Sequence, residues 1–473
     1  MILSLGWKNV WRGKTRSLVV IVAVMLGIFG GIMASGIMTG WIEQRIHDSI
    51  HNEISHAQIH NIKYMENEEI QHTIKNYGDI ASILDTLNGV EAWCPRTKLF
   101  VMAKTSWAAS GFILRGVDME REKEVFELQD HIVEGEFLEK EYRKPSIVIG
   151  AKTAENLKLL NYQVTPEKLD SFDSELLPES LIPKLEEIGN RRFRKERDFR
   201  EKLAEVLSKD ENTTYGDDLI EYFSFYRLGA SVEVTLQDKY GDIIHPVFKV
   251  RGIYDTDNSM WDGMNAYVDR KTLNQYTLLA DNEIHEIAIL ASDNETGAAV
   301  ADKLSELLPE QNVMSWKRIS PELAMYTEFS NLMAYIYVVI ILFALAFGIV
   351  NTMMMSVLER VKELGMLMAI GMNKKRVFTM IMAESVFLTL TGAVLGMLAS
   401  GIIVEILSHT GINFGMWSEG FEAIGYATIV YPVVTIENYL VITVMVIFTG
   451  IVASIWPARK ALRLNPVEAL RME

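Results

Sequence analysis

The chain alternates between four long apolar blocks and stretches in which polar and apolar positions are mixed. Each block approaches or exceeds the roughly 20 apolar residues that an α-helix needs to cross the hydrocarbon core of a bilayer. The pattern therefore predicts four transmembrane helices, at residues 17–40, 332–356, 377–406 and 439–456.

The first block follows a basic leader and ends close to Ala34, Ser35 and Gly36, small residues that also suit a secretory signal. The apolar run of a signal is only about 7 to 15 residues long. Because this block is longer, we predict an anchor that is not cleaved.

Lys and Arg cluster before the first predicted helix, between the second and third, and after the fourth, within residues 8–16, 360–376 and 459–471. Short cytoplasmic segments carry an excess of these residues. We therefore predict that both termini and the segment 357–376 are cytoplasmic, whereas residues 41–331 and the loop 407–438 are external.

The predicted external domain is acidic, with 53 Asp and Glu against 33 Lys and Arg in residues 41–331, a net charge of −20. Nucleic acids need a basic surface, so we expect no nucleic-acid partner. The single cysteine, Cys94, allows no internal disulfide, and the domain must rely on its own core.

Strand-like and helical runs alternate through this domain, which predicts an α+β fold with a hairpin turning at Asp238–Asp242. A charged, helical stretch at residues 161–227 interrupts the rhythm and is interpreted as an insertion. Its cationic run, Arg191–Arg200, is interpreted as a solvated face, with docking of an acidic partner as the alternative. The predicted fold class is a membrane α-helical protein with four transmembrane helices, both termini inside, and a large extracytoplasmic α+β domain.

Two motifs only resemble chemical sites. The "RGKT" at Arg12–Thr15 ends like a nucleotide-binding P-loop, but the glycine required five positions before Gly13 is Lys8. Four histidines, at 47, 51, 56 and 60, lack the Cys or carboxylate pattern that would complete a zinc site. We expect no metal, no cofactor and no catalytic activity in this chain.

Small residues spaced by four positions allow membrane helices to approach closely. Such pairs occur in the first and third predicted helices: Gly27 and Gly31, Gly36 and Gly40, and Gly392 and Gly396. Charge inside a membrane is costly and is usually functional. Glu384, about two turns into the third helix, is expected to pair with a neighbouring helix, and Glu405 to reach the outer interface.

The segment 357–376 is amphipathic at helical spacing, with Val357, Leu358, Val361, Leu364 and Met368 along one side. It predicts a short cytoplasmic helix and loop. Residues 1–16 mix Trp7 and Trp11 with four cations and predict a helix lying in the membrane interface. Residues 457–473 form the predicted cytoplasmic tail.

Three stretches resemble a known family. "LERVKELGMLMAIGMNKKRV" is similar to the segment between the second and third membrane helices of the FtsX-like permeases, the membrane subunits of ABC transporters of the MacB and lipoprotein-releasing type. "WKNVWRGKTRSLVVIVAVMLGI" resembles the family's start and first helix, and "WPARKALRLNPVEALR" its closing motif. Met368 departs from the family, because many members have Arg there.

The resemblance implies that the short cytoplasmic helix docks on a separate ABC ATPase subunit, which binds the ATP and Mg²⁺. The residues that match the family's motif are Glu359, Arg360, Glu363, Leu364, Gly365, Ala369 and Gly371. A second permease, identical or homologous, is implied as a further partner. In the closing motif, Asn465 and Pro466 are suited to begin a helix.

We therefore expect a permease subunit in a bacterial inner membrane that releases or exports lipoprotein, with a periplasmic lipoprotein carrier as a further partner. The alternatives are a mechanotransmission subunit that controls a periplasmic hydrolase and an export permease for a small antibiotic or peptide. The residues expected to contact the amphiphile and membrane lipids, with an ordinary aromatic belt as the alternative, are Met33, Ile37, Trp41, Leu332 and Tyr335.

Overall fold

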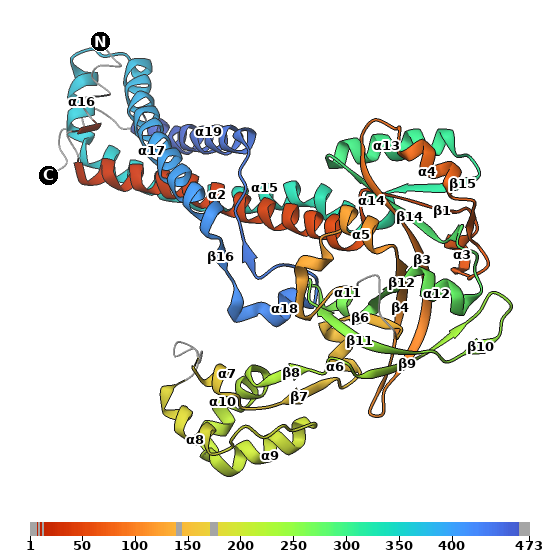
Figure 1. The fold of residues 1–473 in the computed structure, drawn as a ribbon. Helices are drawn as coiled ribbons and strands as arrows, with labels where there is room; N and C mark the ends of the chain where they lie inside the picture. The colour runs from red at the N-terminus through yellow and green to blue at the C-terminus, as the bar shows by residue number, and fades with distance from the viewer. Residues whose placement is uncertain (1–6, 8–9, 12–13, 139–143, 171–177, 463–473) are drawn as a thin grey trace. The chain divides into compact units, whose positions relative to one another are not determined.

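The computed structural model describes residues 7, 10–11, 14–138, 144–170 and 178–462. Its contacts divide the chain into two units. The helical unit comprises residues 1–46, 322–418 and 427–473, and the α+β unit comprises residues 47–321 and 419–426. Each unit is described by itself, and both can be followed in Figure 1.

Four helices in the described chain are long and apolar enough to cross a membrane, which confirms the predicted set. They are α2 (Lys14–Asp48), α15 (Pro321–Glu359), α17 (Lys374–Thr410) and α19 (Ile436–Ala461). Each extends beyond its predicted span because hydropathy marks where a helix leaves the apolar zone, whereas the helix itself ends at a cap or a turn. For example, α15 begins at Pro321, a residue favoured in the first helical turn.

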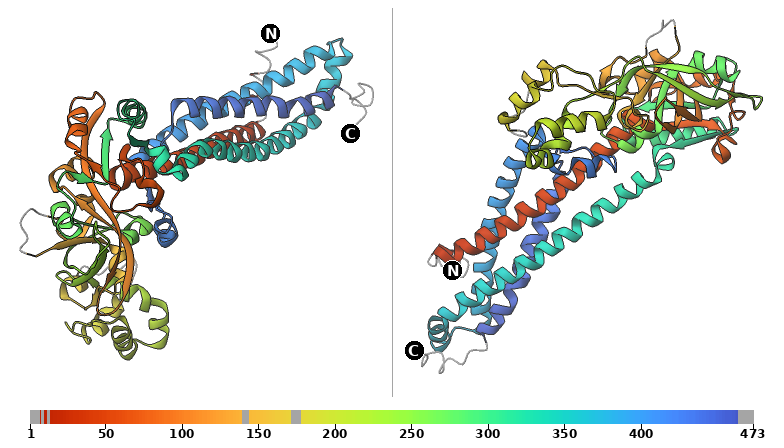
Figure 2. Two further views of the ribbon diagram at one scale, coloured as in Figure 1. Left: turned by 90° about the vertical axis from the view of Figure 1, so that its right-hand side faces the viewer. Right: turned by 90° about the horizontal axis from the view of Figure 1, so that it is seen from below.

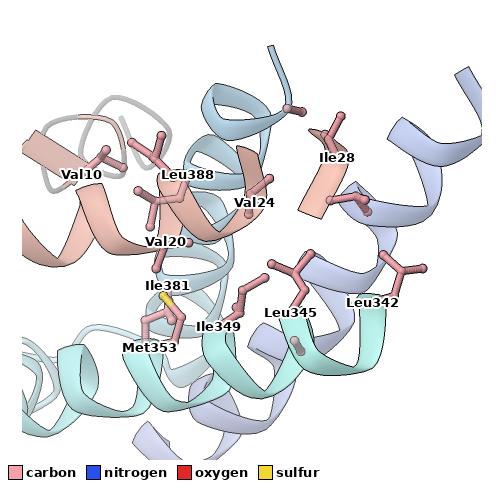
Figure 3. Packing of buried hydrophobic residues seen from close by; sticks show 14 of the residues in the cluster. Val10, Val20, Val24, Ile28, Leu342, Leu345, Ile349, Met353, Ile381 and Leu388 are labelled. Atoms are coloured by element: carbon pink, nitrogen blue, oxygen red, sulfur yellow. The ribbon is translucent and has the colours of Figure 1, made fainter. Parts of the chain in front are cut away.

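The four helices run alongside one another in both views of Figure 2. One buried apolar cluster joins them. Figure 3 shows side chains of this cluster from three of the helices: Val20, Val24 and Ile28 of α2, Leu342, Leu345 and Ile349 of α15, and Ile381 and Leu388 of α17. Trp7 belongs to the predicted interfacial helix, and its ring centroid lies 5.5 Å from that of Phe387 in α17. Most of residues 1–16, and the part of the closing motif at 463–473, fall outside the described residues.

Close helix packing occurs at four of the six predicted glycines. A Cβ at Gly392 would lie 2.7 Å from Val24 Cβ, and one at Gly396 would lie 2.9 Å from Ile28 Cβ, so α17 crosses α2 there. Gly27 and Gly31 face side chains of α15 and α19 at 3.1 Å.

The remaining two glycines correct the prediction. Gly36 and Gly40 pack against the extended segment 431–434 that precedes α19, and not against a helix. The amide of Val433 donates to the Gly36 carbonyl at 3.0 Å. A four-residue glycine spacing shows where backbone can approach, but it does not show what kind of backbone does so.

Short elements lie between the long helices. Between α15 and α17 lies α16 (Val361–Ala369), and before α19 come β16 (Ile412–Asn413), η4 (Gly415–Trp417), α18 (Ser418–Glu422) and β17 (Ile429–Val430). Strands β16 and β17 pair as an antiparallel hairpin.

The α+β unit confirms the predicted class. In chain order its elements are η1 (Ser49–Ile54), β1 (Ala57–Asn61), α3 (Tyr64–Asn67), β2 (Ile74–Lys75), α4 (Gly78–Leu84), β3 (Val90–Lys104), β4 (Ala109–Val117), α5 (Met119–Val125), η2 (Leu128–His131), β5 (Ile132–Gly135), β6 (Ser146–Gly150), α6 (Ala151–Asn156), β7 (Leu160–Tyr162), α7 (Pro166–Asp170), η3 (Glu179–Leu181), α8 (Ile182–Glu186), α9 (Glu196–Val206), α10 (Lys209–Tyr222), β8 (Ser224–Tyr226), β9 (Ser231–Gln237), β10 (Ile243–Ile244), β11 (Val247–Tyr254), α11 (Ser259–Met264), β12 (Asn265–Asp269), α12 (Arg270–Thr277), β13 (Glu283–Ile284), β14 (Glu286–Ala291), α13 (Asn294–Leu307), β15 (Gln311–Ser315) and α14 (Trp316–Ile319).

A mixed sheet of eleven strands organises the unit, in the order β10-β9-β11-β6-β12-β4-β3-β14-β1-β15, with β5 paired to β11. The long β3 pairs with both β4 and β14 and, at its far end, with β9. The predicted hairpin is confirmed: β9 and β10 are antiparallel, and Asp238 Oδ1 accepts from the amides of Tyr240 and Asp242 in the turn.

The insertion at 161–227 is largely helical, as predicted, and has an apolar core of its own. Its members include Leu185, Phe199, Leu203, Leu219 and Phe223, all fully buried. A capping box of Ser208 and Glu211 begins α10. Strands β7 and β8, which pair as a two-stranded sheet, are at the beginning and the end of the insertion in sequence, where it leaves and rejoins the larger fold.

Candidate functional site

The segment between α15 and α17 folds as the short helix α16. It ends because Gly371 takes φ +98, where a side chain would be strained, and the amide of Met372 donates to the Leu367 carbonyl at 3.0 Å. Asn373 then caps α17, its Oδ1 accepting from the amide of Lys375 at 3.0 Å. The sequence "GMN" thus makes the turn between the two helices.

One face of α16 is buried against the helical unit, through Val361, Leu364 and Gly365. The other face is exposed and partly apolar: Met366 is 52% exposed and Ile370, just beyond the helix, is 80% exposed. Leu358 was predicted on the same side as Leu364, but it is 49% exposed whereas Leu364 is buried. Leu358 belongs to the last turn of α15, whose axis is not that of α16, so a single helical spacing through both was wrong.

Arg360 joins α16 to α17. Its Nη1 donates to Glu384 Oε2 at 3.0 Å, and its Nε donates to Glu363 Oε2 at 3.2 Å. The Arg360 and Glu384 side chains are 20% and 9% exposed, so this charge pair is largely withdrawn from solvent. Glu384 therefore contacts the residue immediately before α16.

The seven residues expected to dock an ATPase do not share one surface. Glu359, Ala369 and Gly371 are exposed, and Arg360 and Glu363 are half-buried. Leu364 is only 2% exposed, and Gly365 is also buried, so their environment is this chain's own helices. Met366 and Ile370 were missed because a sequence pattern does not show which apolar side chains remain uncovered.

A cavity of about 310 Å³ lies at the other end of the helical unit. It is lined by Thr39, Ile42, Glu43, Ile46, Thr327, Tyr335, Thr435, Glu437 and Asn438. Only Tyr335 of the five expected amphiphile contacts reaches it. The lining combines two carboxylates, the hydroxyls of three threonines and one asparagine amide with two isoleucines and Tyr335.

The other expected amphiphile contacts lie elsewhere. Trp41 Nε1 donates to the Ala427 carbonyl at 3.2 Å, and its ring stacks on Phe414 with centroids 5.3 Å apart. Leu332 is 50% exposed, and Met33 and Ile37 are half-buried. Glu405, expected at an interface, is well exposed and lies 3.5 Å from His409.

A second charged constellation is buried in the α+β unit around Glu286, on β14. Its carboxylate lies 3.0 Å from Lys98 Nζ, 3.3 Å from Arg96 Nη1 and 3.7 Å from Arg115 Nη1. Burial alone would raise the pKa of Glu286, but the three cations outweigh it and hold that pKa well below its usual range. Arg96 is also bound to Glu122 of α5.

These contacts join strands β3, β4 and β14 to helix α5, so the constellation holds elements of the core together. Both carboxylates are already engaged by cations, and the arrangement resembles no nucleophile with a base and an orienting group. Nothing about it was predictable, because its members are up to 190 positions apart in sequence.

The four histidines at and after the end of α2, at positions 47, 51, 56 and 60, do not converge on one point. His47 and His51 stack with ring centroids 4.2 Å apart, whereas His60 lies in the core, 3.9 Å from Glu286. Burial lowers the pKa of His56 and of His60 to about 4, so both are neutral near pH 7. Among the described residues no group of three or more His, Cys, Asp or Glu could hold a metal ion.

Comparison with known families identifies the helical part. Residues 335–466, which include α16 and its ion pair, match the family model described as "FtsX-like permease C-terminal". This part of the chain is therefore similar to the C-terminal part of FtsX-like permeases.

Relatives of this chain include the macrolide export ATP-binding/permease protein MacB of Chlorobium luteolum, 36% identical over 126 residues that cover 27% of this chain and 16% of that protein. The ABC transporter permease YvrN of Bacillus subtilis is 28% identical over 248 residues, covering 48% of this chain and 55% of that protein. The matches thus span between 16% and 55% of these relatives' own lengths.

Two solved structures are similar to this chain at 12% and 11% identity, both with a TM-score of 0.29. One is the extracellular domain of the transporter YknZ from Gram-positive bacteria, of which 99% is covered, with 55% of this chain. The other is the periplasmic region of MacB from Actinobacillus actinomycetemcomitans, of which 92% is covered, with 57% of this chain. At such scores neither supports an inference about function.

Proposed function

We propose that this chain is an FtsX-like permease, the membrane subunit of an ABC-type complex in a bacterial inner membrane, and that the exposed side of α16 binds a separate ATPase subunit in the cytoplasm. One observation carries the proposal: Met366 and Ile370 are exposed on a short helix that is tied to α17 through Arg360 and Glu384. ATP and Mg²⁺ belong to the partner, and this chain supplies the surface that responds to it.

The exposed apolar side chains explain why a partner is needed at this position. In the sequence, Met366 and Ile370 are followed closely by Lys374 and Lys375. The positive-inside rule associates such basic residues with the cytoplasmic side of the membrane. Covering Ile370 completely would contribute up to about 1.5 to 3 kcal/mol, and covering Met366, which is already half-buried, about half as much. Because Arg360 contacts both helices, a displacement of α16 would be transmitted to α17.

Docking is tested by the variant Ile370→Asp, with Met416→Asp as a matched control, since Met416 is 88% exposed in the loop between α17 and α19. Each variant is co-purified with the ATPase encoded beside this chain. We expect Ile370→Asp to lose the ATPase and its stimulated hydrolysis, while Met416→Asp keeps both. Wild-type retention of the ATPase by Ile370→Asp would refute docking through α16.

For the transported material, we propose lipoprotein, with this chain pairing with a second permease and delivering to a periplasmic carrier. Support comes from the cavity beside Tyr335, whose mixture of carboxylates, hydroxyls and apolar side chains suits the junction between the polar and acyl parts of an amphiphile. The relatives' name favours a second candidate, export of a small antibiotic such as a macrolide. Mechanotransmission to an external hydrolase stays the third.

Photocrosslinkers at Ile37 and Tyr335 separate the three candidates. Capture of lipoprotein without ATP, and its release on hydrolysis, is the expected result. Capture of added macrolide in competition with lipoprotein would replace lipoprotein by drug export. Capture of phospholipid alone, with a soluble protein bound to the α+β unit, would favour mechanotransmission.

A further inference from the structure

Strands β7 and β8 of the insertion lie side by side (Figure 1), and the segment before α9 joins them through one isolated bridge, which makes a small three-stranded arrangement. Strand β7 is its centre: β8 pairs with one edge, and on the other edge Tyr162 and Phe193 exchange two backbone hydrogen bonds of 2.8 Å. Tyr162 and Phe193 point into the insertion's apolar core.

Successive side chains of a strand point to opposite faces. Asn161, next to Tyr162, and Arg192 and Arg194, next to Phe193, therefore lie on the opposite face. Tyr226 pairs with Leu160 and so shares the face of Tyr162, which places the neighbours of Tyr226, Phe225 and Arg227, on the opposite face as well. The face so defined, called the arginine face, carries Asn161, Arg192, Arg194, Phe225 and Arg227.

The three arginines lack the carboxylate partners that other arginines of the insertion have. None of Arg192, Arg194 and Arg227 forms an ion pair within the part of the chain that the structure describes. On α9, by contrast, Arg200 binds Glu196 at 2.8 Å and Asp217 at 2.7 Å.

The electrostatics of Arg227 reflect this lack. Its pKa is lowered from the ordinary arginine value, first by burial and then by Arg194 and Arg192. Like charges within interaction range of one another, with no acid between them, repel in the unliganded protein. An anion placed among them would relieve that repulsion.

A second, independent observation is at Asn161. This residue is 2% exposed, and its Nδ2 has no hydrogen-bond acceptor within the described chain. Leaving a buried amide donor without an acceptor costs about 1 to 3 kcal/mol. Its strand position places it on the face that carries the three arginines, so a ligand with acceptor oxygens could satisfy both.

We propose that the arginine face is a binding site for a phosphate group. Guanidinium groups present planar pairs of donors that match phosphate oxygens, and the Asn161 amide supplies a further donor. Since residues 41–331 carry a net charge of −20, a free anion is repelled by most of this region, which makes a concentrated cationic site selective. The site lies in the insertion and does not depend on ATPase docking or on the transported material.

The test uses the full chain in nanodiscs of zwitterionic lipid, with fluorescent polyphosphate as the probe. The variant Arg192→Gln/Arg194→Gln/Arg227→Gln should bind it about tenfold or more weakly. The control Arg197→Gln/Arg200→Gln/Lys202→Gln removes the same charge from α9 and should bind as the wild type does. Equal weakening in both variants, or no binding by the wild type, would overturn the proposal.

Additional probes establish the chemistry and its source. Polyglutamate of equal length that binds as tightly as polyphosphate would overturn the preference for phosphate. Sedimentation with phosphatidylglycerol vesicles but not phosphatidylcholine vesicles, when inorganic phosphate fails to compete, would identify a lipid headgroup. Competition by inorganic phosphate would identify a soluble phosphate ligand.

The substitution Asn161→Asp provides a test that does not remove a cation. It is nearly isosteric and places a carboxylate among the three arginines, in the position that the ligand would neutralise. We expect a higher unfolding temperature together with loss of polyphosphate binding. Unchanged polyphosphate binding in a folded Asn161→Asp protein would show that this face is not the site.

Discussion

Replacing Glu384 by Gln tests whether the contact between α16 and α17 is a strong electrostatic link. The change keeps the shape of the side chain and removes the charge that Arg360 Nη1 contacts at 3.0 Å. Arg360 would keep its contact with Glu363, 3.2 Å away, while its connection to α17 is weakened.

The expected loss lies between two limits. Removing one partner of a fully buried ion pair costs about 3 to 5 kcal/mol, whereas exposed pairs contribute about 0.2 to 1 kcal/mol. With side chains 20% and 9% exposed, we expect about 2 kcal/mol. At about 2 to 4 °C per kcal/mol for units of this size, the unfolding temperature should fall by roughly 4 to 8 °C.

The assay is thermal unfolding of the purified chain in nanodiscs, followed by tryptophan fluorescence. Glu363→Gln is the control, because Glu363 is 42% exposed in its pair with Arg360 and its loss should cost about 0.5 kcal/mol. The double variant Arg360→Gln/Glu384→Gln should cost less than the sum of its single changes, since each removes the same pair.

Two results would refute the reasoning. One is an unfolding temperature of Glu384→Gln within 1 °C of the wild type, which corresponds to a loss below about 0.5 kcal/mol. The other is strict additivity in the double variant, which would mean that the two side chains do not interact energetically. If the pair also transmits ATPase movement, Glu384→Gln should retain the ATPase but respond less to it.

Three further predictions concern other parts of the chain. Gly392→Val should disrupt the crossing of α17 with α2, where a Cβ would lie 2.7 Å from Val24, and should lower the unfolding temperature strongly. Gly348→Ala is the control and should have little effect, because no atom lies within 4 Å of a Cβ at that position. Equal effects of the two changes would contradict close packing at Gly392. Burial raises the pKa of Asp262 to about 8, so the folded state retains a proton that the unfolded state loses near pH 4, and stability should fall as pH rises from about 4 to 8. Asp262→Asn should flatten that dependence in thermal unfolding at pH 6 and pH 8, and an unchanged slope would show that another group titrates. Finally, because the native Cys94 is fully buried, an engineered Cys at Asp210 should react with an impermeant maleimide in intact cells while one at Lys374 should not; labelling at Lys374 would disprove the predicted orientation.

Periodicity alone was enough to predict the four long helices and the α+β class, because apolar runs and alternating patterns are local properties. Periodicity was insufficient where the packing or burial of a residue depends on which other segment it contacts. Gly392 and Gly36 belong to the same kind of spacing, yet one packs on a helix and the other on extended chain. Likewise, Leu358 and Leu364 had the same predicted role, but only Leu364 is buried.

Charged residues show this limit most clearly. Glu384 was recognisable as costly within an apolar block, and a pairing was expected, but its partner Arg360 lies 24 positions earlier and could not be named from spacing. Glu286 offered no signal at all, since it occurs in an ordinary strand and is enclosed by cations from β3 and β4.

The two sets of arginines in the α+β unit explain why residue type by itself does not define a site. Arg96 is fully buried, binds Glu122 and Glu286, and lies 3.7 Å over the ring of Phe126; its capacity to bind an anion is already used by the protein. Arg192 and Arg194 occur in a run that was interpreted as a solvated face, and they have no carboxylate partner within the described residues. What distinguishes them is the backbone exchange between Tyr162 and Phe193, which places both arginines beside a buried amide that also lacks an acceptor. An arginine is available to a ligand where the fold leaves both its charge and its neighbours' donors unsatisfied, and in this unit that condition is met on the insertion and not in the core.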